Sequence, residues 1–397
     1  MPLKSIWHAG RFLTTGWVIR NYREYCRVKP HRRALLSYIV QPLLPPARFR
    51  DRVLFSPFGI AQEIPRALNE MGYSVDIVNF NNKRWQPRGS YDLFIGHGAL
   101  NFERLAAALP RDTKKIYFAT GLYWKEGNRR EAERLYDLAM RTGWLLPPER
   151  CVSLDEDRAN SLADGIVQLG NARAGETYAA FGNPHGINNA SYPAAWDGWR
   201  TKDYAAGSQH FLFYEGPGNV HKGLDRILEA FAALPLHLHV CQHIQPPFGR
   251  VYRRLLSGAP NIHVYQFIRQ RSAQFYDLAR RCNWALSATC GEGQPGSIVE
   301  MMAHGLIPIL PETANIDLGA WGIPLPGCSA LQIAETCSAA SAIPAAECQS
   351  MAGQVIEETR ARYSVEHFRR SFQNAVRNIA EGTPTQAPAR PAAAIRS

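Results

Sequence analysis

Several features that would place this chain in a specialised class are missing. No apolar run reaches 18 residues, so no membrane-spanning helix is expected, and the basic N-terminus lacks the apolar core and cleavage site of a signal peptide. The eight cysteines form no Cys-x-x-Cys pair, and several stand in apolar, strand-like runs, which is typical of reduced, buried thiols. These absences argue against a zinc site. They indicate a cytoplasmic protein, with a peripheral position on the inner face of the cell membrane left open.

The residues that are present describe an ordinary globular protein with one unusual segment. Of the 397 residues, 46% are apolar and 20% charged, and the length predicts two domains rather than one. The net charge is +11, and residues 1–52 hold eleven Lys or Arg against Glu24 and Asp51. A basic segment on a near-neutral body favours contact with anionic lipid or polyphosphate over nucleic acid.

Residues 1–50 mix aromatic residues with arginine. The run Arg11–Val28 is expected to be a helix that Pro30 ends. Two interpretations remain open. The segment is either a helical arm packed on the body with its arginines in water, or an interfacial contact in which aromatic rings enter the headgroup zone of an anionic membrane.

From residue 51, short apolar strands alternate with amphipathic helices, beginning with a strand expected at "RVLFSPF". Such alternation predicts parallel sheets with both faces covered. A Gly-, Asn- and Pro-rich stretch over residues 181–209 interrupts the pattern, which then restarts. We therefore predict an α/β protein with two Rossmann-like, doubly wound domains facing a cleft. The expected parts are a basic aromatic arm over 1–50, an N-terminal acceptor domain over 51–200, a C-terminal donor domain over 201–362, a closing helix over 363–382 and a disordered tail over 383–397.

The stretch "GEGQPGSIVEMMAHGLIPIL", which begins at Gly291, follows the expected strand "NWALSATC". In a doubly wound domain this position lies at the cleft. Its glycines would let the backbone approach a ligand, and the helix that opens at Gly296 and Ser297 would offer free N–H groups to a phosphate. Glu300 could accept hydrogen bonds from a ribose diol, and Glu292 from the hydroxyls of a second sugar.

A second glycine-rich loop, "YEGPGNVHKGLD", joins a strand to a helix in the same half of the chain. The ammonium of Lys222 would reach a diphosphate there as a point charge, and Gly216 and its neighbouring glycines would keep the loop close to the ligand. Together the two loops predict a site for a nucleotide diphosphate sugar.

Both loops resemble a known family. "E292-GQPGSIV-E300" followed by "MMAHGLIPI" resembles the Glu-x7-Glu signature of retaining glycosyltransferases of the GT-B fold, family 4 type. "GPGNVHKGLDRILEAFAAL" is similar to the phosphate loop of that family, and "FGIAQEIPRALNEMGYSVDIV" to its first N-domain unit. The resemblance covers most of residues 51–380.

The resemblance implies roles for individual residues. Glu300 would hold the ribose, Glu292 the hydroxyls of the donor sugar and Lys222 the diphosphate, with Glu292, His97 and Lys222 serving catalysis. Further donor contacts would come from Gly216, Gly296, Ser297, Ile298, Ile268 and Gly59, with His97 and Gly59 facing the sugar from the N-terminal domain.

One departure concerns the phosphate site. The family has an arginine five positions before the lysine, and Pro217 stands there in this chain. Arg269, Arg271 or His221 could replace the missing cation. Asp155 and Asp157 are expected in a solvated loop, and no Asp-x-Asp pair stands at a strand end, so neither a metal nor a cofactor is expected.

The resemblance therefore predicts a metal-independent hexosyltransferase. It would move a sugar with retention from a nucleotide diphosphate sugar, such as a UDP-sugar, to a glycan or lipid-linked acceptor in bacterial surface polysaccharide synthesis. No nucleic-acid partner is expected. Two alternatives stay open: a sugar-nucleotide epimerase of the same fold, and a non-catalytic GT-B binding or scaffold protein, which Pro217 favours.

Overall fold

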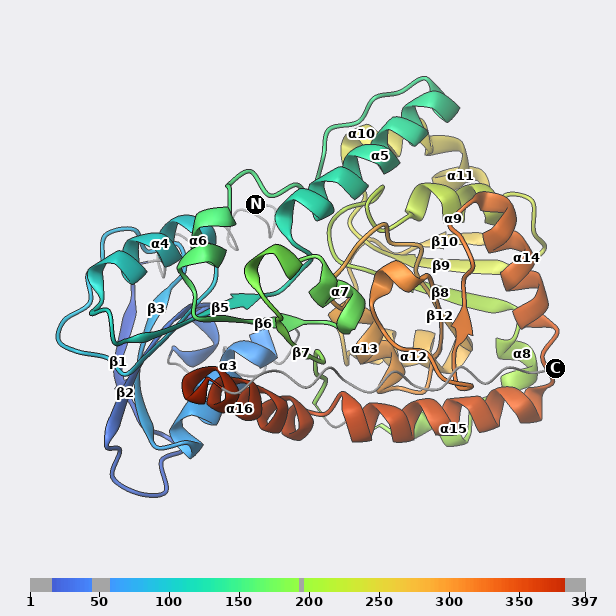
Figure 1. Ribbon diagram of the computed structural model, residues 1–397. Helices are drawn as coiled ribbons and strands as arrows, with labels where there is room; N and C mark the ends of the chain where they lie inside the picture. Colours follow the sequence, from blue (N-terminus) through green and yellow to red (C-terminus); the bar gives the residue numbers. More distant parts are fainter. Residues whose placement is uncertain (1–15, 45–57, 193–195, 383–397) are drawn as a thin grey trace, which may run out of the picture.

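The computed structural model describes residues 16–44, 58–192 and 196–382, and they form two sheets that lie side by side (Figure 1). In the described part of the N-terminal half, seven strands pair in the order β1-β3-β2-β4-β5-β6-β7, and only β1 runs antiparallel to its neighbour. The elements are β1 (Val18–Tyr22), β2 (Arg32–Tyr38), α3 (Phe58–Glu70), β3 (Tyr73–Asn79), β4 (Leu93–Gly96), α4 (Ala99–Ala108), β5 (Lys114–Ala119), α5 (Trp124–Thr142), α6 (Asp157–Leu162), β6 (Gly165–Leu169), α7 (Ala172–Glu176) and β7 (His185–Ile187).

The described residues of the second half form a fully parallel sheet of six strands in the order β10-β9-β8-β11-β12-β13. Its elements are α8 (Tyr204–Gly207), β8 (His210–Tyr214), α9 (Leu224–Phe231), β9 (His237–Cys241), α10 (Pro246–Val251), α11 (Arg253–Gly258), β10 (Ile262–Val264), α12 (Ala273–Arg281), β11 (Trp284–Leu286), α13 (Gly296–Met302), β12 (Ile307–Leu310), β13 (Ile323–Pro324), α14 (Ala330–Ser341), α15 (Ala345–Arg362) and α16 (Val365–Glu381). The two parallel sheets with helices on their faces confirm the α/β class and the doubly wound architecture predicted from the sequence.

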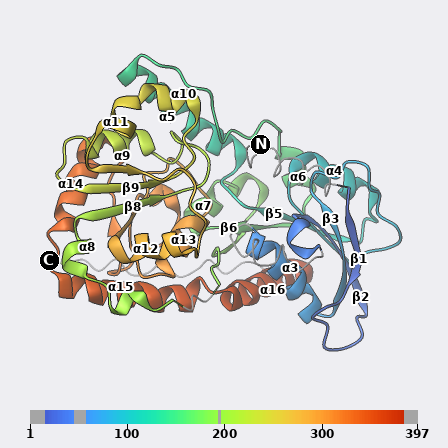
Figure 2. The ribbon, with the colours of Figure 1, turned by 180° about the vertical axis from the view of Figure 1, so that it is seen from behind.

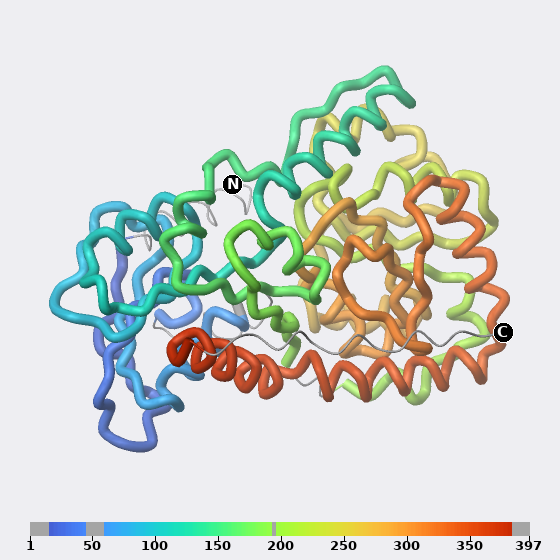
Figure 3. The backbone as a smooth tube through the Cα atoms, viewed as in Figure 1, coloured from blue at the N-terminus to red at the C-terminus, as the bar shows by residue number. Residues whose placement is uncertain are grey.

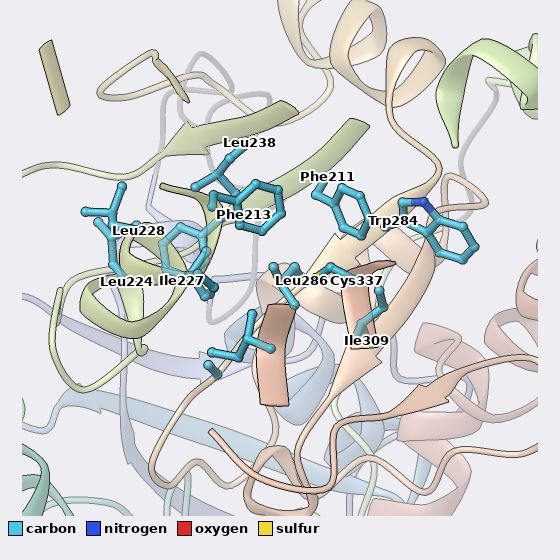
Figure 4. Packing of buried hydrophobic residues seen from close by; sticks show 14 of the residues in the cluster. Phe211, Phe213, Leu224, Ile227, Leu228, Leu238, Trp284, Leu286, Ile309 and Cys337 are labelled. Carbon is cyan, nitrogen blue, oxygen red and sulfur yellow. The ribbon is translucent and has the colours of Figure 1, made fainter. Parts of the chain in front are cut away.

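Many strands are apolar throughout because both of their faces are buried. Phe211, Phe213, Trp284 and Leu286 project from β8 and β11 against α9, as Figure 4 shows for the C-terminal core. Phe211 and Trp284 are fully buried, and their rings stack with centroids 6.0 Å apart. Leu212 and Ala285, which alternate with them, face the opposite core around α13 and α12. A strand between two helical layers has no polar face, so it reads as a continuous apolar run.

Two helices connect the halves of the molecule. After α15, the chain returns to the N-terminal sheet, where Phe372 of α16 joins the core beside α3 and Arg369 pairs with Glu63 of α3 at 2.6 Å. Figures 1 and 2 show α15 and α16 running beneath both sheets. In the other direction, the chain of α5 leaves β5 and lies against the C-terminal half (Figure 3). Its Leu135 and Leu138 join the core of α9. Each half therefore contributes a helix to the hydrophobic packing of the other.

The helix expected over Arg11–Val28 is wrong in the part that the structure describes. Val18–Tyr22 is β1, and Arg32–Tyr38 is β2, which pairs in parallel with both β3 and β4. Residues 18–38 therefore belong to the N-terminal sheet and not to a separate arm. The run "RALLSY" is fully buried from Ala34 because β2 lies inside the sheet. The arginines that flank this run favoured an exposed arm, so the strand was not predicted from the sequence. The strand expected at 52–58 falls on residues outside the described part, except for Phe58, which opens α3.

The basic residues around β1 remain available to solvent. Arg20, Arg23, Arg27 and Lys29 are exposed, as is Val28. None of the helices in the described ranges is both long and apolar enough to cross a membrane. The segment over residues 383–397, expected as a tail, lies outside the described residues.

Deleting residues 1–45 should unfold the N-terminal half, because the deletion removes β2 from the interior of the sheet and exposes edges of β3 and β4. Thermal unfolding followed by circular dichroism should show loss of the cooperative transition. Deleting residues 1–15, which leaves all described strands in place, is the matched control and should keep the transition. A variant lacking residues 1–45 that unfolds like the full chain would contradict the position of β2.

Candidate functional site

Lys222 lies at the centre of a buried charge cluster in the loop that joins β8 to α9. Its Nζ is 2.7 Å from Oε1 of Glu292 and 3.1 Å from Oε2 of Glu215. The side chain is 6% exposed. Burial alone would lower the pKa of Lys222, but the two carboxylates outweigh it and raise the pKa above its ordinary value. The lysine therefore stays charged inside the protein.

Glu215, which the sequence analysis did not select, supplies the second carboxylate of the cluster. It directly follows β8, and its Oε1 accepts a hydrogen bond from Ser287 Oγ at 2.8 Å. Its Oε2 accepts one from Ser297 Oγ at 2.7 Å. The signal in the sequence was a glutamate at the end of the apolar strand "HFLFY". A carboxylate placed there points into the crevice at the edge of the sheet.

His221 holds Glu292 from the other side. Its Nε2 lies 2.7 Å from the carbonyl oxygen of Gly291 and 3.1 Å from Oε1 of Glu292, while its Nδ1 is 3.5 Å from Sγ of Cys290. Burial would lower the pKa of His221, but Cys290 and Glu292 raise it to about 9. Burial likewise opposes ionisation of Glu292, but Lys222, His221 and, more distantly, Arg150 keep its pKa well below the usual range. Oε2 of Glu292 takes no hydrogen bond from the described residues.

Glu300 is already bound on both oxygens. Nε of Arg271 donates to its Oε1 at 2.6 Å, Nη2 of Arg271 lies 3.1 Å from its Oε2, and Ser191 Oγ donates to Oε2 at 2.6 Å. Arg271 has a positive φ of 58°, a backbone conformation that L-residues adopt rarely. Its Nη2 also donates to the carbonyl oxygen of Tyr192 at 2.8 Å. A ribose could reach the Glu300 carboxylate only after Arg271 moves.

The glycines of "GEGQPG" serve the contact between the two halves. A Cβ on Gly293 would lie 2.6 Å from the carbonyl oxygen of Leu169 and 2.9 Å from that of Thr120, at the ends of β6 and β5. A Cβ on Gly291 would lie 2.9 Å from Leu122. From the sequence, this freedom was expected to serve a ligand. In the structure it allows the backbone of one domain to approach the backbone of the other.

Gln294 fastens the same loop. Its Oε1 accepts the backbone N–H of Asn189 at 2.7 Å, and the side chain of Asn189 donates to the carbonyl oxygen of Gln294 at 3.1 Å. Nε2 of Gln294 donates to Asn188 and to the carbonyl oxygen of Asn315. Since Asn188 and Asn189 follow β7, the loop that carries Glu292 is held directly on the N-terminal half.

Other expected donor contacts have mixed positions. A Cβ on Gly216 would meet nothing within 4 Å, so the loop is open at that point. Gly296 is partly exposed and opens α13, as predicted. The backbone N–H of Ile298, by contrast, donates to Pro295, and its side chain is fully buried. Ile268 is also buried, and its carbonyl oxygen accepts a hydrogen bond from Tyr214 at 2.6 Å. Their side chains pack in the core, and their contact with a donor stays a prediction.

The two expected residues of the N-terminal half lie apart from the Lys222 cluster. His97 follows β4, and its Nδ1 is 2.9 Å from the carbonyl oxygen of Phe118. Burial lowers the pKa of His97, so the ring is neutral and Nδ1 carries the proton. Gly59 is covered by the ring of Tyr192, because a Cβ there would lie 2.8 Å from that ring. No hydrogen bond or ion pair joins either residue to Glu292 or Lys222 in the ranges described.

Comparison with solved structures identifies the fold. The chain superposes on sucrose-phosphate synthase from Thermosynechococcus elongatus (TM-score 0.59, 15% identity) over 90% of this chain and 100% of that one. It also matches a trehalose-6-phosphate synthase from Burkholderia multivorans (0.59, 12%; 89% and 100%) and Anabaena HepE in complex with UDP and glucose (0.55, 13%; 88% and 100%). Scans of family models and of curated protein sequences gave no match. The predicted GT-B fold is thus confirmed.

Replacing Glu292 by Gln should lower the pKa of His221 from about 9, because the replacement removes the negative charge beside the ring. A pH titration of the histidine ring signals by NMR would measure this, with His97 as the internal control.

In wild-type protein, the pKa of His221 is raised from 6.5, so its protonation stabilises the fold fully below pH 6.5. This stabilisation is lost as the pH rises through 9. A His221→Gln variant should therefore lose less free energy of unfolding between pH 6.5 and 9 than the wild type; equal losses would contradict the assignment.

Proposed function

We propose that this protein is a glycosyltransferase that transfers a sugar from a nucleotide diphosphate sugar to a glycan or lipid-linked acceptor. The observation that carries the proposal is the buried Lys222, held between Glu215 and Glu292 at the edge of the C-terminal sheet in a GT-B fold. Buried charges that serve no ligand are costly to maintain, and sheet edges of this kind are where α/β proteins bind ligands. HepE, which has this fold, was crystallised with UDP and glucose, which makes UDP the first nucleotide to test.

The residues of the cluster suit different parts of such a donor. Lys222 presents a cation to the diphosphate and stabilises the charge that develops on it as the glycosidic bond breaks. Glu292 has one oxygen bound to Lys222 and His221, which leaves Oε2 to accept a sugar hydroxyl. Both carboxylates stay in place because serine hydroxyls and His221 bind them. We propose front-side attack by the acceptor hydroxyl, with retention and without a metal.

A hollow beside the Gly291 loop suits the acceptor. It has a volume of about 410 Å³ and is lined by Tyr123, Lys125, Glu126, Arg129, Arg130, Arg173, Glu176 and Thr177. Arg130 connects the two sites, because a Cβ on Gly291 would lie 3.1 Å from its Cδ. A hollow of polar side chains, open to solvent, fits a hydroxyl-rich glycan or the headgroup of a lipid-linked one.

The exposed basic residues around β1 support an anionic membrane surface as the setting. In this proposal the enzyme acts peripherally on the inner face of the cell membrane and builds a bacterial surface polysaccharide. The exposed Arg20, Arg23, Arg27 and Lys29 would bring it to the lipid that carries the acceptor.

One observation favours a second candidate, a non-catalytic GT-B protein. Lys222 and Glu300 both have partners within the protein, and Pro217 stands where the family has a cation. A protein that had lost donor binding would keep such internally neutralised pairs for stability.

Replacing Lys222 by Met should lower donor turnover about 100-fold or more, since the developing charge on the diphosphate loses its cation. Turnover would be followed as release of nucleoside diphosphate from a panel of UDP- and GDP-sugars with a hydroxyl acceptor mixture. Lys83→Met, at an exposed position, is the matched control and should retain wild-type rates.

Three other results would count against the proposal. Equal turnover by the Lys222→Met variant would show that the site is wrong. Formation of a new sugar nucleotide without acceptor would indicate an epimerase. Failure of calorimetry to detect binding of UDP or GDP to the wild type would favour the non-catalytic candidate.

A further inference from the structure

A diphosphate in this site needs more positive charge than Lys222 supplies. Glu215 and Glu292 already neutralise that ammonium, and Pro217 stands where the resembling family has a second cation. Two of the residues that could replace it are engaged elsewhere: Arg271 binds Glu300, and His221 binds Glu292 and the carbonyl oxygen of Gly291. The search for a second cation rests on the proposed function. The other half of the chain offers a different candidate for that cation.

The segment after α5 is fastened against the phosphate loop. Glu131, a buried residue of α5, accepts the backbone N–H groups of Glu149 and Arg150 at 2.9 Å each. The carboxylate of Glu149 in turn accepts the backbone N–H of Asn219 at 2.9 Å. Arg150 is thus held through its backbone N–H, and its neighbour Glu149 binds Asn219, three residues before Lys222.

The side chain of Arg150 crosses the loop at the residue after Pro217. A Cβ on Gly218 would lie 2.8 Å from Cγ and 3.3 Å from Cδ of Arg150. Gly218 also has a φ of +106°, which disfavours any side chain there. Glycine at this position therefore serves two purposes: it allows the turn, and it lets the arginine lie directly on the loop.

The charge of Arg150 acts on the Lys222 cluster, but its guanidinium forms no ion pair with the carboxylates of the cluster. Among the groups that act on Glu292, Arg150 contributes alongside Lys222 and His221 to lowering its pKa, after burial, which opposes ionisation. Arg150 is exposed, and no carboxylate or carbonyl oxygen of the described residues accepts a hydrogen bond from its guanidinium. The backbone of Arg150 is fixed, and its guanidinium has no partner among the described residues. It can therefore bind an anion next to Lys222 without first breaking an ion pair.

We propose that Arg150 is the second cation of the donor site and binds the diphosphate together with Lys222. Its planar guanidinium can donate two hydrogen bonds to one phosphate, which a lysine cannot do. In this proposal the second cation comes from the segment between α5 and α6, whereas in the resembling family it comes from the loop of the C-terminal half. Both halves of the chain consequently contribute charge to the same ligand, and the packing of α5 on the C-terminal core keeps them together.

Calorimetric titration with nucleoside di- and monophosphates tests this proposal. The wild type, Arg150→Gln, Arg150→Lys and the control Arg254→Gln, an exposed arginine of α11, would each be titrated with UDP, UMP, GDP and GMP. Arg150→Gln should weaken binding of the preferred diphosphate about 10- to 100-fold, the usual effect of losing a charge-assisted hydrogen bond. The monophosphate should change less than about threefold, and Arg150→Lys should recover part of the loss.

The outcomes separate this inference from the function on which it rests. If the wild type binds a diphosphate and Arg150→Gln binds it equally well, Arg150 is not a ligand and the proposed function still stands. If Arg150→Gln weakens the mono- and diphosphate equally, the residue acts on the fold and the inference fails. If the wild type binds no nucleoside diphosphate, both proposals fall.

Discussion

The burial of the Lys222 ammonium is the constraint on which the site depends. An unpaired ammonium in the protein interior costs several kcal/mol, so two carboxylates must lie beside it. Glu215 and Glu292 provide these carboxylates, and Ser287, Ser297 and His221 supply hydrogen bonds to them. These hydrogen bonds come from the β11–α13 loop, from the first turn of α13 and from the β8–α9 loop. A substitution at any of these partners would remove a hydrogen bond or an ion pair from the cluster.

The same dependence ties the two halves together. The loop that carries Glu292 packs through Gly293 against the ends of β5 and β6, and Gln294 binds it to Asn189. On the far side, Arg141 of α5 forms a 2.6 Å ion pair with the fully buried Asp225 of α9. Breaking a buried pair of this kind leaves a charge without compensation and costs about 3–5 kcal/mol. The positions of Lys222 and Glu292 are therefore fixed by contacts between the halves as much as by the sheet that bears them.

Much of the fold followed from local patterns. The apolar runs that form β3, β8 and β12 lie between helices on both faces. Because both faces are buried, each run is apolar over consecutive residues and can be recognised without the rest of the chain. β2 was missed because its exposed arginines and its distance from the alternating pattern suggested an arm. Its burial depends on β3 and β4, which follow more than 30 residues later. Glu215 was missed for a similar reason, because its importance comes from Ser287, Ser297 and Lys222, none of which is adjacent to it in the sequence.

Periodicity and spacing by themselves determined the α/β class and the two doubly wound units. These features are local, because a strand buried on both faces or a loop at its end is visible in a few consecutive residues. That Lys222, Glu292 and Glu300 belong to one site stays a prediction. Only the tertiary structure decided how the charges are paired: Glu300 with Arg271, Glu292 with Lys222, and an unpaired Arg150 laid over Gly218. Electrostatic pairing depends on distances of a few ångströms between residues far apart in the chain, and those distances exist only after the two halves have packed together.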